Sequence, residues 1–343
     1  MRRVGLIGYC ALACTALVTT PAAQTSMVGR VQTLAPDVYF YEGDISKGHC
    51  NNGWVVFEDY VLVIDANYPS GAREVIAKIR ELTKKPIRFA FDTHHHGDHA
   101  YGNQVWVDEG ATPVAHTGVL DEMKRLETGL FGDKPGRWEG EAKGREDLRG
   151  SKLKPPSLLF PDTLIFDDGK HRVELRHFGT AHTKGDGVAW LPKEKIVFTG
   201  DMAVNGPFNF VGDGHVASWI KTLSGVAGLG ASTVGPGHGP LGDASVLRDQ
   251  STFFQELSAA VTGASKGGTP ETVQAAIPSI RAQVLKNSQV ARYVGDGFPA
   301  QVAKVYNELT GLTLPDRRAE VQAERTHVAW HHGHAHGAPQ RRN

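Results

Sequence analysis

Short apolar runs and one amphipathic stretch alternate along the first part of the chain. The runs are rich in β-branched and aromatic residues and are separated by turn residues, which is typical of strands. They fall at residues 37–42, 53–57, 60–65 and 87–91. Residues 72–84 instead repeat apolar side chains three or four positions apart, with Arg, Glu and Lys between them, which predicts a helix. This strand–helix–strand order predicts a sheet with a covering helix.

The second part of the chain repeats this organisation. Four strands, then a helix, then a short strand are expected at residues 163–166, 171–178, 187–191, 195–199, 215–229 and 232–235. Strands followed by helices in both halves predict an α/β fold, an αββα sandwich in which two sheets pack together between helices. The pattern over 243–310 is helical, and the Gly-, Lys-, Glu- and Pro-rich stretch 129–157 predicts a loop over one edge.

The first 23 residues have the features of a secretory signal peptide. Two arginines precede an apolar run over residues 4–18, and small residues end at Ala23, where we expect cleavage. A lipid anchor on Cys14 is the alternative. The run is too short to span a bilayer comfortably, and no later stretch approaches about 18 continuous apolar residues. We therefore expect a periplasmic or secreted protein with no membrane attachment once residues 1–23 are removed.

Charge and cysteine content exclude several classes of protein. Basic and acidic residues number 37 each, so the net charge is zero and the electrostatic footprint of a nucleic-acid binder is absent. After the expected cleavage Cys50 is the one cysteine left, so an internal disulfide cannot form. The unusual feature is the count of 16 histidines, five of which lie in a tail over 316–343 that we expect to be disordered.

Four imidazole or carboxylate donors occur within six positions directly after a predicted strand. The segment reads Thr93-His-His-His-Gly-Asp-His99. His94 and His96 alternate along extended backbone and so point the same way, whereas His95 between them is expected to point away. Asp98 and His99 come from the turn that follows. Burying such groups without partners is costly, so this segment predicts a binding site.

Three later segments each place one more such residue in a glycine-rich loop at a strand end. They contain His182, Asp201 and His238. Glycine lets backbone approach a bound ion closely, and strand ends provide the rigid support that metal geometry requires. The four segments together supply seven donors, all of them imidazole or carboxylate. This donor set suits zinc, with manganese or iron as weaker alternatives.

The order His-x-His-x-Asp-His, His, Asp, His resembles the metallo-β-lactamase superfamily, over residues 30–245. The resemblance implies an αββα catalytic domain with a two-metal site, and the helical pattern after it predicts a helical extension over 246–315. It assigns the first metal to His94, His96 and His182, the second metal to Asp98, His99 and His238, and a bridging role to Asp201. Family members with iron pairs often carry a carboxylate at the position of His96, so the histidine favours two zinc ions.

Two metal ions about 3.5–4 Å apart would lower the pKa of a water molecule bound between them toward about 7, and the resulting hydroxide would be ready to attack a carbonyl carbon. Asp98 is then both a ligand and the candidate catalytic residue that orients this hydroxide or carries its proton. Residues expected to support the ligands or to line a substrate pocket follow from their places beside these segments. The supporting residues are Asp65, Thr183 and Asp186, and the pocket residues are Asn209 and His49.

A β-lactam is the leading candidate substrate of this expected exported hydrolase. Asn209 begins a loop similar to one that zinc β-lactamases carry, but Val204 stands where those enzymes commonly have a lysine. Residues 93–103 also resemble exported zinc hydrolases of the quinoprotein-relay type. A lactonase or another ester or thioester hydrolase is therefore the alternative, and an iron-dependent sulfur dioxygenase is the alternative outside the hydrolases. A small-molecule substrate is expected, and the chain could form a homo-oligomer.

Overall fold

The computed structural model describes residues 27–314. The predicted signal peptide and the predicted histidine-rich tail lie outside the described residues.

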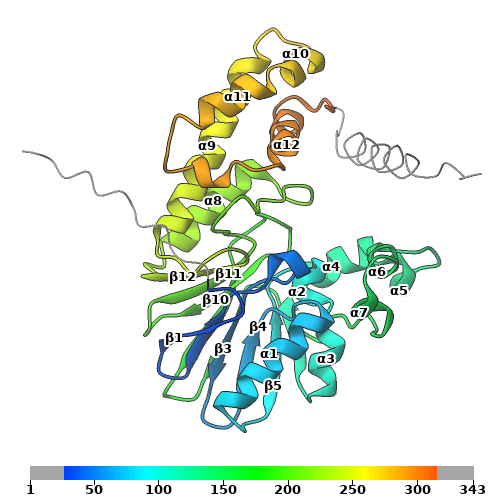
Figure 1. The fold of residues 1–343 in the computed structure, drawn as a ribbon, viewed down its shortest axis with the longest axis vertical. Coiled ribbons are helices and arrows are strands. Elements are labelled where there is room, and N and C mark those ends of the chain that lie inside the picture. The colour runs from blue at the N-terminus through cyan, green and yellow to red at the C-terminus, as the bar shows by residue number, and fades with distance from the viewer. Residues whose placement is uncertain (1–26, 315–343) are drawn as a thin grey trace, which may run out of the picture.

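Two β-sheets form the centre of the described molecule (Figure 1). The first has seven strands in the order β1 to β7, antiparallel from β1 to β4 and parallel from β4 to β7. Its strands are β1 (Val31–Ala35), β2 (Val38–Tyr41), β3 (Asn52–Val56), β4 (Val61–Ile64), β5 (Ile87–Asp92), β6 (Thr112–His116) and β7 (Leu158–Phe160).

The second sheet has five strands in the order β12-β11-β10-β9-β8. All its neighbours are antiparallel except β11 and β12, which run parallel. The strands are β8 (Thr163–Asp167), β9 (Arg172–His177), β10 (Gly187–Leu191), β11 (Ile196–Gly200) and β12 (Thr233–Pro236). Each strand predicted from the pattern of apolar residues is present, with bounds within two residues of the prediction.

The two sheets bury one apolar layer between them, and helices bury the outer faces. In β4, Leu62 and Ile64 point into the layer shared with the second sheet. Val61 and Val63 point the other way, because successive side chains on a strand alternate, and they pack with Val75 of α1. A strand buried on both faces is apolar throughout, as β4 is.

Helices α1 (Pro69–Leu82) and α3 (Asn103–Asp108) cover the first sheet, the latter through Trp106. Short helices α2 (Gly97–Ala100) and α4 (Thr117–Leu126) follow β5 and β6. The predicted helix at 72–84 therefore exists as α1, beginning at Pro69, whose fixed φ suits a first helical turn.

The second sheet is covered by the helices of the last part of the chain, which extend beyond the sheets in Figure 1. The helices are α8 (Val216–Ala227), α9 (Ser245–Ser265), α10 (Pro270–Ala275), α11 (Ile277–Val284) and α12 (Phe298–Thr310), with the 3₁₀ turn η2 (Ala291–Tyr293). A separate 3₁₀ turn, η1 (Ile45–Lys47), follows β2 in the first part of the chain. Trp219 of α8 and Phe254 of α9 share one buried cluster with Val188 and Val197 of the sheet. Helices thus lie outside both sheets, which confirms the predicted αββα sandwich.

The expectation of a loop over 129–157 is partly wrong. This segment contains α5 (Thr128–Phe131), α6 (Arg137–Ala142) and α7 (Glu146–Arg149). Trp138 and Leu148 are buried there with Tyr101. Helices of four to six residues are too short to show a helical repeat of apolar residues, so the pattern could not reveal them. Within the described residues, no helix is both long and apolar enough to cross a membrane.

Candidate metal centre

Four loops meet at one edge of the sandwich, and each follows the carboxyl end of a strand. The first loop follows β5 and carries His94 to His99. The others follow β9, β11 and β12 and carry His182, Asp201 and His238. Strands β9 and β11 both run antiparallel to β10, and β12 runs parallel to β11, so these three loops emerge on the same side. The sheet topology therefore brings together residues that are far apart in sequence.

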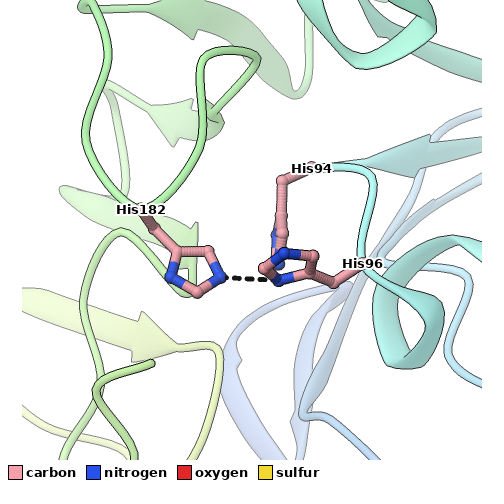
Figure 2. A group of neighbouring side chains, drawn as sticks. All are labelled: His94, His96 and His182. Atoms are coloured by element: carbon pink, nitrogen blue, oxygen red, sulfur yellow. Dashed lines mark hydrogen bonds between the residues drawn. The ribbon is translucent and has the colours of Figure 1, made fainter. Parts of the chain in front are cut away.

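His94, His96 and His182 surround one point in space (Figure 2). Their ring centroids lie 4.6–4.8 Å apart, and the rings are nearly perpendicular to one another. His182 Nε2 lies 2.8 Å from His96 Nδ1. All three rings can therefore present a nitrogen to one ion.

Hydrogen bonds determine which nitrogen each ring can offer. Thr93 Oγ1 donates to Asp65 Oδ1 at 2.6 Å and lies 3.1 Å from His94 Nδ1, so it accepts the Nδ1 proton. His182 Nδ1 donates to the carbonyl oxygen of Phe210 at 2.9 Å. The remaining Nε2 of His94 is buried without a hydrogen-bond partner, as expected for a nitrogen kept for a metal.

His96 is oriented in the opposite way, by the carboxylate of Asp213. Its Nε2 lies 2.9 Å from Asp213 Oδ2 and donates to it, which leaves Nδ1 to face His182. Asp213 itself accepts hydrogen bonds from the two terminal guanidinium nitrogens of Arg137, at 2.7 and 3.0 Å. This chain of contacts fixes the ring of His96 and its tautomer.

A second group combines Asp98, His99 and His238. Asp98 Oδ2 lies 3.0 Å from His238 Nε2 and 3.5 Å from His99 Nε2. His99 Nδ1 lies 3.0 Å from Asp65 Oδ2, so the carboxylate of Asp65 turns His99 Nε2 toward Asp98. This group offers two imidazoles and one carboxylate, a set that suits zinc.

Asp201 lies between the two groups. Its Oδ2 is 3.6 Å from His182 Nε2 in the first group, and its Oδ1 is 3.3 Å from His99 Nε2 and 3.5 Å from His238 Nε2 in the second. One carboxylate with an oxygen directed at each group is the geometry needed to link two ions. All seven candidate ligands therefore lie in one connected cluster.

Glycines allow the ligand loops to approach each other this closely. A Cβ on Gly237 would lie 2.1 Å from Asp201 Oδ1. A Cβ on Gly200 would lie 2.1 Å from Thr93 Oγ1, and its φ of +51° is in the left-handed region that other residues rarely adopt. Side chains at either position would separate the loops after β5, β11 and β12.

The three supporting residues predicted from the sequence contact these loops. Asp65, with a left-handed φ of +67°, accepts hydrogen bonds from Thr93 and lies against His99. Thr183 donates its N–H and its hydroxyl to Asp186, at 2.9 and 2.5 Å, and so closes the loop that follows His182. Burial raises the pKa of Asp186 to about 7.

The two ligand groups differ in charge. Burial and the neighbouring imidazoles lower the pKa of His182 to about 3 and that of His94 well below its usual value, so these two imidazoles of the first group are neutral. Burial alone would lower the pKa of His238, but Asp201 and Asp98 raise it, and the histidines bring the pKa of Asp98 down to about 2 despite its burial. A cation entering the second group must therefore displace protons.

A cavity of about 420 Å³ opens beside this cluster. Its walls come from the residue before α1, the loop after β5, α2 and the residue that follows it, α6, and the loop after β11. They are formed by Tyr68, His95, His96, Gly97, Asp98, Tyr101, Arg137, Gly140, Glu141 and Phe210. His95, which we expected to point away, lines this cavity, and its Nε2 is 3.9 Å from Asp213 Oδ2.

Neither residue predicted to line the pocket is among those walls. His49 is buried beside α1, where its Nε2 lies 2.9 Å from Ser70 Oγ. Asn209 is buried under α12, and its carbonyl oxygen accepts a hydrogen bond from Gln301. The neighbour of Asn209, Phe210, lines the cavity in its place. The sequence identified this loop but not which of its side chains faces the cavity.

Sequence reasoning missed Asp213, Arg137, Glu141 and Tyr68. Asp213 ends the loop that begins at Asn209. Its position two residues before the predicted helix at 215–229 was the one sequence feature that could have identified it. Arg137 and Glu141 lie on α6, in the segment that we expected to be a loop. No local pattern distinguishes these residues from surface charges.

Comparisons with known proteins agree with this architecture. A family model described as the metallo-beta-lactamase superfamily matches residues 45–238, more than half of the chain. The metallo-beta-lactamase type 2 of Bacillus cereus is 24% identical over 204 residues, which cover 57% of this chain and 70% of that protein. The metallo-beta-lactamase type 2 of Bacteroides fragilis is 32% identical over 107 residues, 29% of this chain and 43% of that protein.

Among solved structures, the metallo-beta-lactamase from Pontibacter korlensis superposes with a TM-score of 0.53 at 20% identity. The superposition covers 66% of this chain and 98% of that one. At this identity the likeness establishes the fold, and the remaining third of this chain has no counterpart in that structure.

Proposed function

The chain belongs to the metallo-β-lactamase superfamily, and on this premise we propose that it is an exported dizinc hydrolase that opens a cyclic amide or ester. Members of a family that share a metal centre can act on different substrates, so the site itself must carry the argument. Export rests on the sequence of residues 1–23 alone.

The observation that carries the proposal is the carboxylate of Asp201, which has one oxygen directed at each of two ligand groups. The first group offers three imidazoles and the second offers two imidazoles with a carboxylate. Buried imidazole and carboxylate donors without a thiolate fit a pair of zinc ions. Zinc, when bound, lowers the pKa of a coordinated water to about 7 and polarises a carbonyl oxygen.

Asp98, like His96, is a candidate ligand that also lines the cavity. Its pKa of about 2 keeps it a carboxylate at neutral pH, so it can orient a water molecule or accept its proton. The cavity of about 420 Å³ lies within the range of small-molecule sites. These residues therefore support hydrolysis of a small substrate held between the cavity and the metal centre.

A β-lactam is the first substrate to test, because the relatives from Bacillus cereus and Bacteroides fragilis are metallo-beta-lactamases. A lactone or another ester or thioester is the second candidate. The cavity holds no lysine among its lining residues, and Val204, at the position where zinc β-lactamases commonly have one, is fully buried in the core. The identity of the substrate therefore needs a direct screen.

Metal analysis tests the dizinc centre. The chain should be ended at residue 315 for this measurement, because the five tail histidines could bind further metal. We expect about two zinc ions per chain and loss of activity with EDTA, because the cluster offers donors for two ions. A content of one iron per chain, or activity that chelation leaves intact, contradicts the proposal.

A substrate screen tests the reaction class. Hydrolysis of nitrocefin, a carbapenem, an acyl-homoserine lactone and a thioester should be followed spectrophotometrically. His96→Ala should lower kcat/KM for the accepted substrate by at least about 100-fold, because even residues that support metal ligands contribute about 10–100-fold. His171→Gln is the matched control, since His171 is a buried histidine on the distant β8–β9 turn. Equal activity of both variants would exclude the centre as the active site.

A further inference from the structure

The cavity beside the metal centre carries one carboxylate outside the candidate ligands. This group is Glu141 of α6, which lines the cavity together with Asp98. The hydroxyl of Tyr68 donates to Glu141 Oε2 at 2.7 Å. The guanidinium of Arg145 lies over the aromatic ring of Tyr68, 3.5 Å from the ring centroid, and so holds the hydroxyl that donates to Glu141 in place. Glu141 is therefore a fixed feature of the wall.

The carboxylate of Glu141 packs closely against the loop that carries Asp98. A Cβ on Gly97 would lie 2.9 Å from Glu141 Oε2. Burial raises the pKa of Glu141, and the charges of Asp98 and Glu127 raise it further, while the hydrogen bond from Tyr68 lowers it. A partly buried carboxylate beside other acids costs free energy unless a cation or an N–H donor approaches it.

No lysine or arginine on this wall is free to offer that compensation. Arg137 is the one lysine or arginine that lines the cavity, and both of its terminal nitrogens contact Asp213. Its charge is thus neutralised by a residue that also orients His96. Of the cavity groups that are neither candidate ligands nor paired in this way, Glu141 alone carries a charge, and that charge is negative.

We infer that Glu141 determines specificity, by binding an ammonium or another N–H donor of the substrate while the metal centre holds the reacting carbonyl. This inference rests on the proposed dizinc function and narrows it to cyclic amides or esters that carry an amino group. The charge of Glu141 weakens the binding of any substrate that places a carboxylate against this wall.

Two small thiols of opposite charge test the inference without catalysis. In the zinc-loaded full-length protein, 2-aminoethanethiol and 3-mercaptopropionate both bind zinc through sulfur and extend an ammonium or a carboxylate into the cavity. Isothermal titration calorimetry gives the ratio of their Kd values. Because the zinc ions themselves attract anions, the informative quantity is the change of this ratio between wild type and Glu141→Gln.

We expect Glu141→Gln to reduce the preference for the cationic thiol by about tenfold, which corresponds to about 1.4 kcal/mol. Glu141→Asp keeps the charge and should retain part of the preference. The matched control is Glu146→Gln, because Glu146 is an exposed acid on the neighbouring α7 that does not line the cavity. Glu146→Gln removes the same charge from the same segment and should give the wild-type ratio of the two Kd values.

An unchanged ratio in Glu141→Gln, or an equal change in Glu146→Gln, overturns the inference and leaves the dizinc function standing. If neither thiol binds the zinc-treated wild type, both the proposed dizinc centre and the inference about Glu141 are contradicted. Thermal unfolding of each variant shows whether a change in ratio comes from loss of the fold.

Discussion

His95 lies between two candidate metal ligands in sequence, but its surroundings differ from theirs. Its side chain is buried and neither ring nitrogen has a hydrogen-bond partner. Burial, together with the neighbouring His96, lowers the pKa of His95 to about 2. A histidine buried without partners cannot take up a proton in the folded protein over most of the acidic range.

This burial makes the free energy of unfolding depend on pH. Between about pH 2 and 6.5 the unfolded chain binds a proton at His95 and the folded protein does not, so stability falls as pH falls below 6.5. In EDTA-treated protein, His95→Asn should reduce the slope of stability against pH by up to about 1.4 kcal/mol per pH unit. Urea unfolding between about pH 5 and 6.5 measures this slope.

His215→Asn is the control for this measurement. His215 is exposed and caps α8 by accepting a hydrogen bond from Ser218, a role that Asn also performs. We expect the slope of stability against pH in His215→Asn to match that of wild type. A slope that His95→Asn leaves unchanged would mean that His95 titrates normally in the folded protein.

At the scale of elements, α9 supports a ligand loop as well as covering the second sheet. Gln250 of α9 is fully buried. Its Oε1 accepts from the N–H of Val204 at 2.8 Å, and its Nε2 donates to the carbonyl oxygen of Met202 at 3.1 Å. Both partners belong to the loop that begins with Asp201, so the helix holds the candidate bridging residue in place.

Gln250→Leu keeps the size of this side chain but leaves the N–H of Val204 without its acceptor, whereas the carbonyl oxygen of Met202 still accepts from the indole N–H of Trp219. An unpaired buried N–H costs about 1–3 kcal/mol. We expect lower stability by urea unfolding and weaker zinc affinity by competition with a chelator. Gln255→Leu, at an exposed position of the same helix, should change neither quantity. Wild-type zinc affinity in Gln250→Leu would show that the loop does not depend on α9.

The elements differ in how far the sequence predicted them. Strand β10 was predicted at its observed bounds, because five apolar or small residues lie between turn residues. Strands β1, β6 and β7 were not predicted: β7 has three residues and β6 contains Pro113. Helices α5 to α7 were missed because four to six residues are too few to show a period of 3.6.

At the scale of the whole molecule, the last helices share a core with the second sheet. One buried cluster runs from Val188 and Trp190 of β10 through Trp219 of α8 to Phe253 of α9 and Leu314. Burying a large apolar side chain contributes about 1.5–3 kcal/mol, so Phe253, Phe254, Leu257 and Val261 of α9 together contribute about 6–12 kcal/mol. This is comparable with the entire stability of a typical domain, about 5–15 kcal/mol.

Ending the chain at residue 244 should therefore abolish cooperative unfolding, although the seven candidate ligands remain. Near-UV circular dichroism and urea unfolding measure the loss, and the chain ended at residue 315 is the control. A truncated protein that unfolds cooperatively would make the residues after 245 an independent extension.

Local sequence determined those features of this protein that depend on neighbouring residues. Apolar residues at period two and near 3.6 specified most strands, α1 and α8, because backbone geometry sets these periods. The motif from His94 to His99 identified a binding site, because so many donors at one strand end cannot be buried without partners.

Only the tertiary structure decided how distant residues meet. Asp213 is 117 positions from His96 and Glu141 is 73 positions from Tyr68, and these pairs leave no local pattern. The same is true of the two oxygens of Asp201, which face different ligand groups because β9, β11 and β12 end on one side. Side chains converge according to the path of the whole chain, which a period of two or 3.6 residues does not encode.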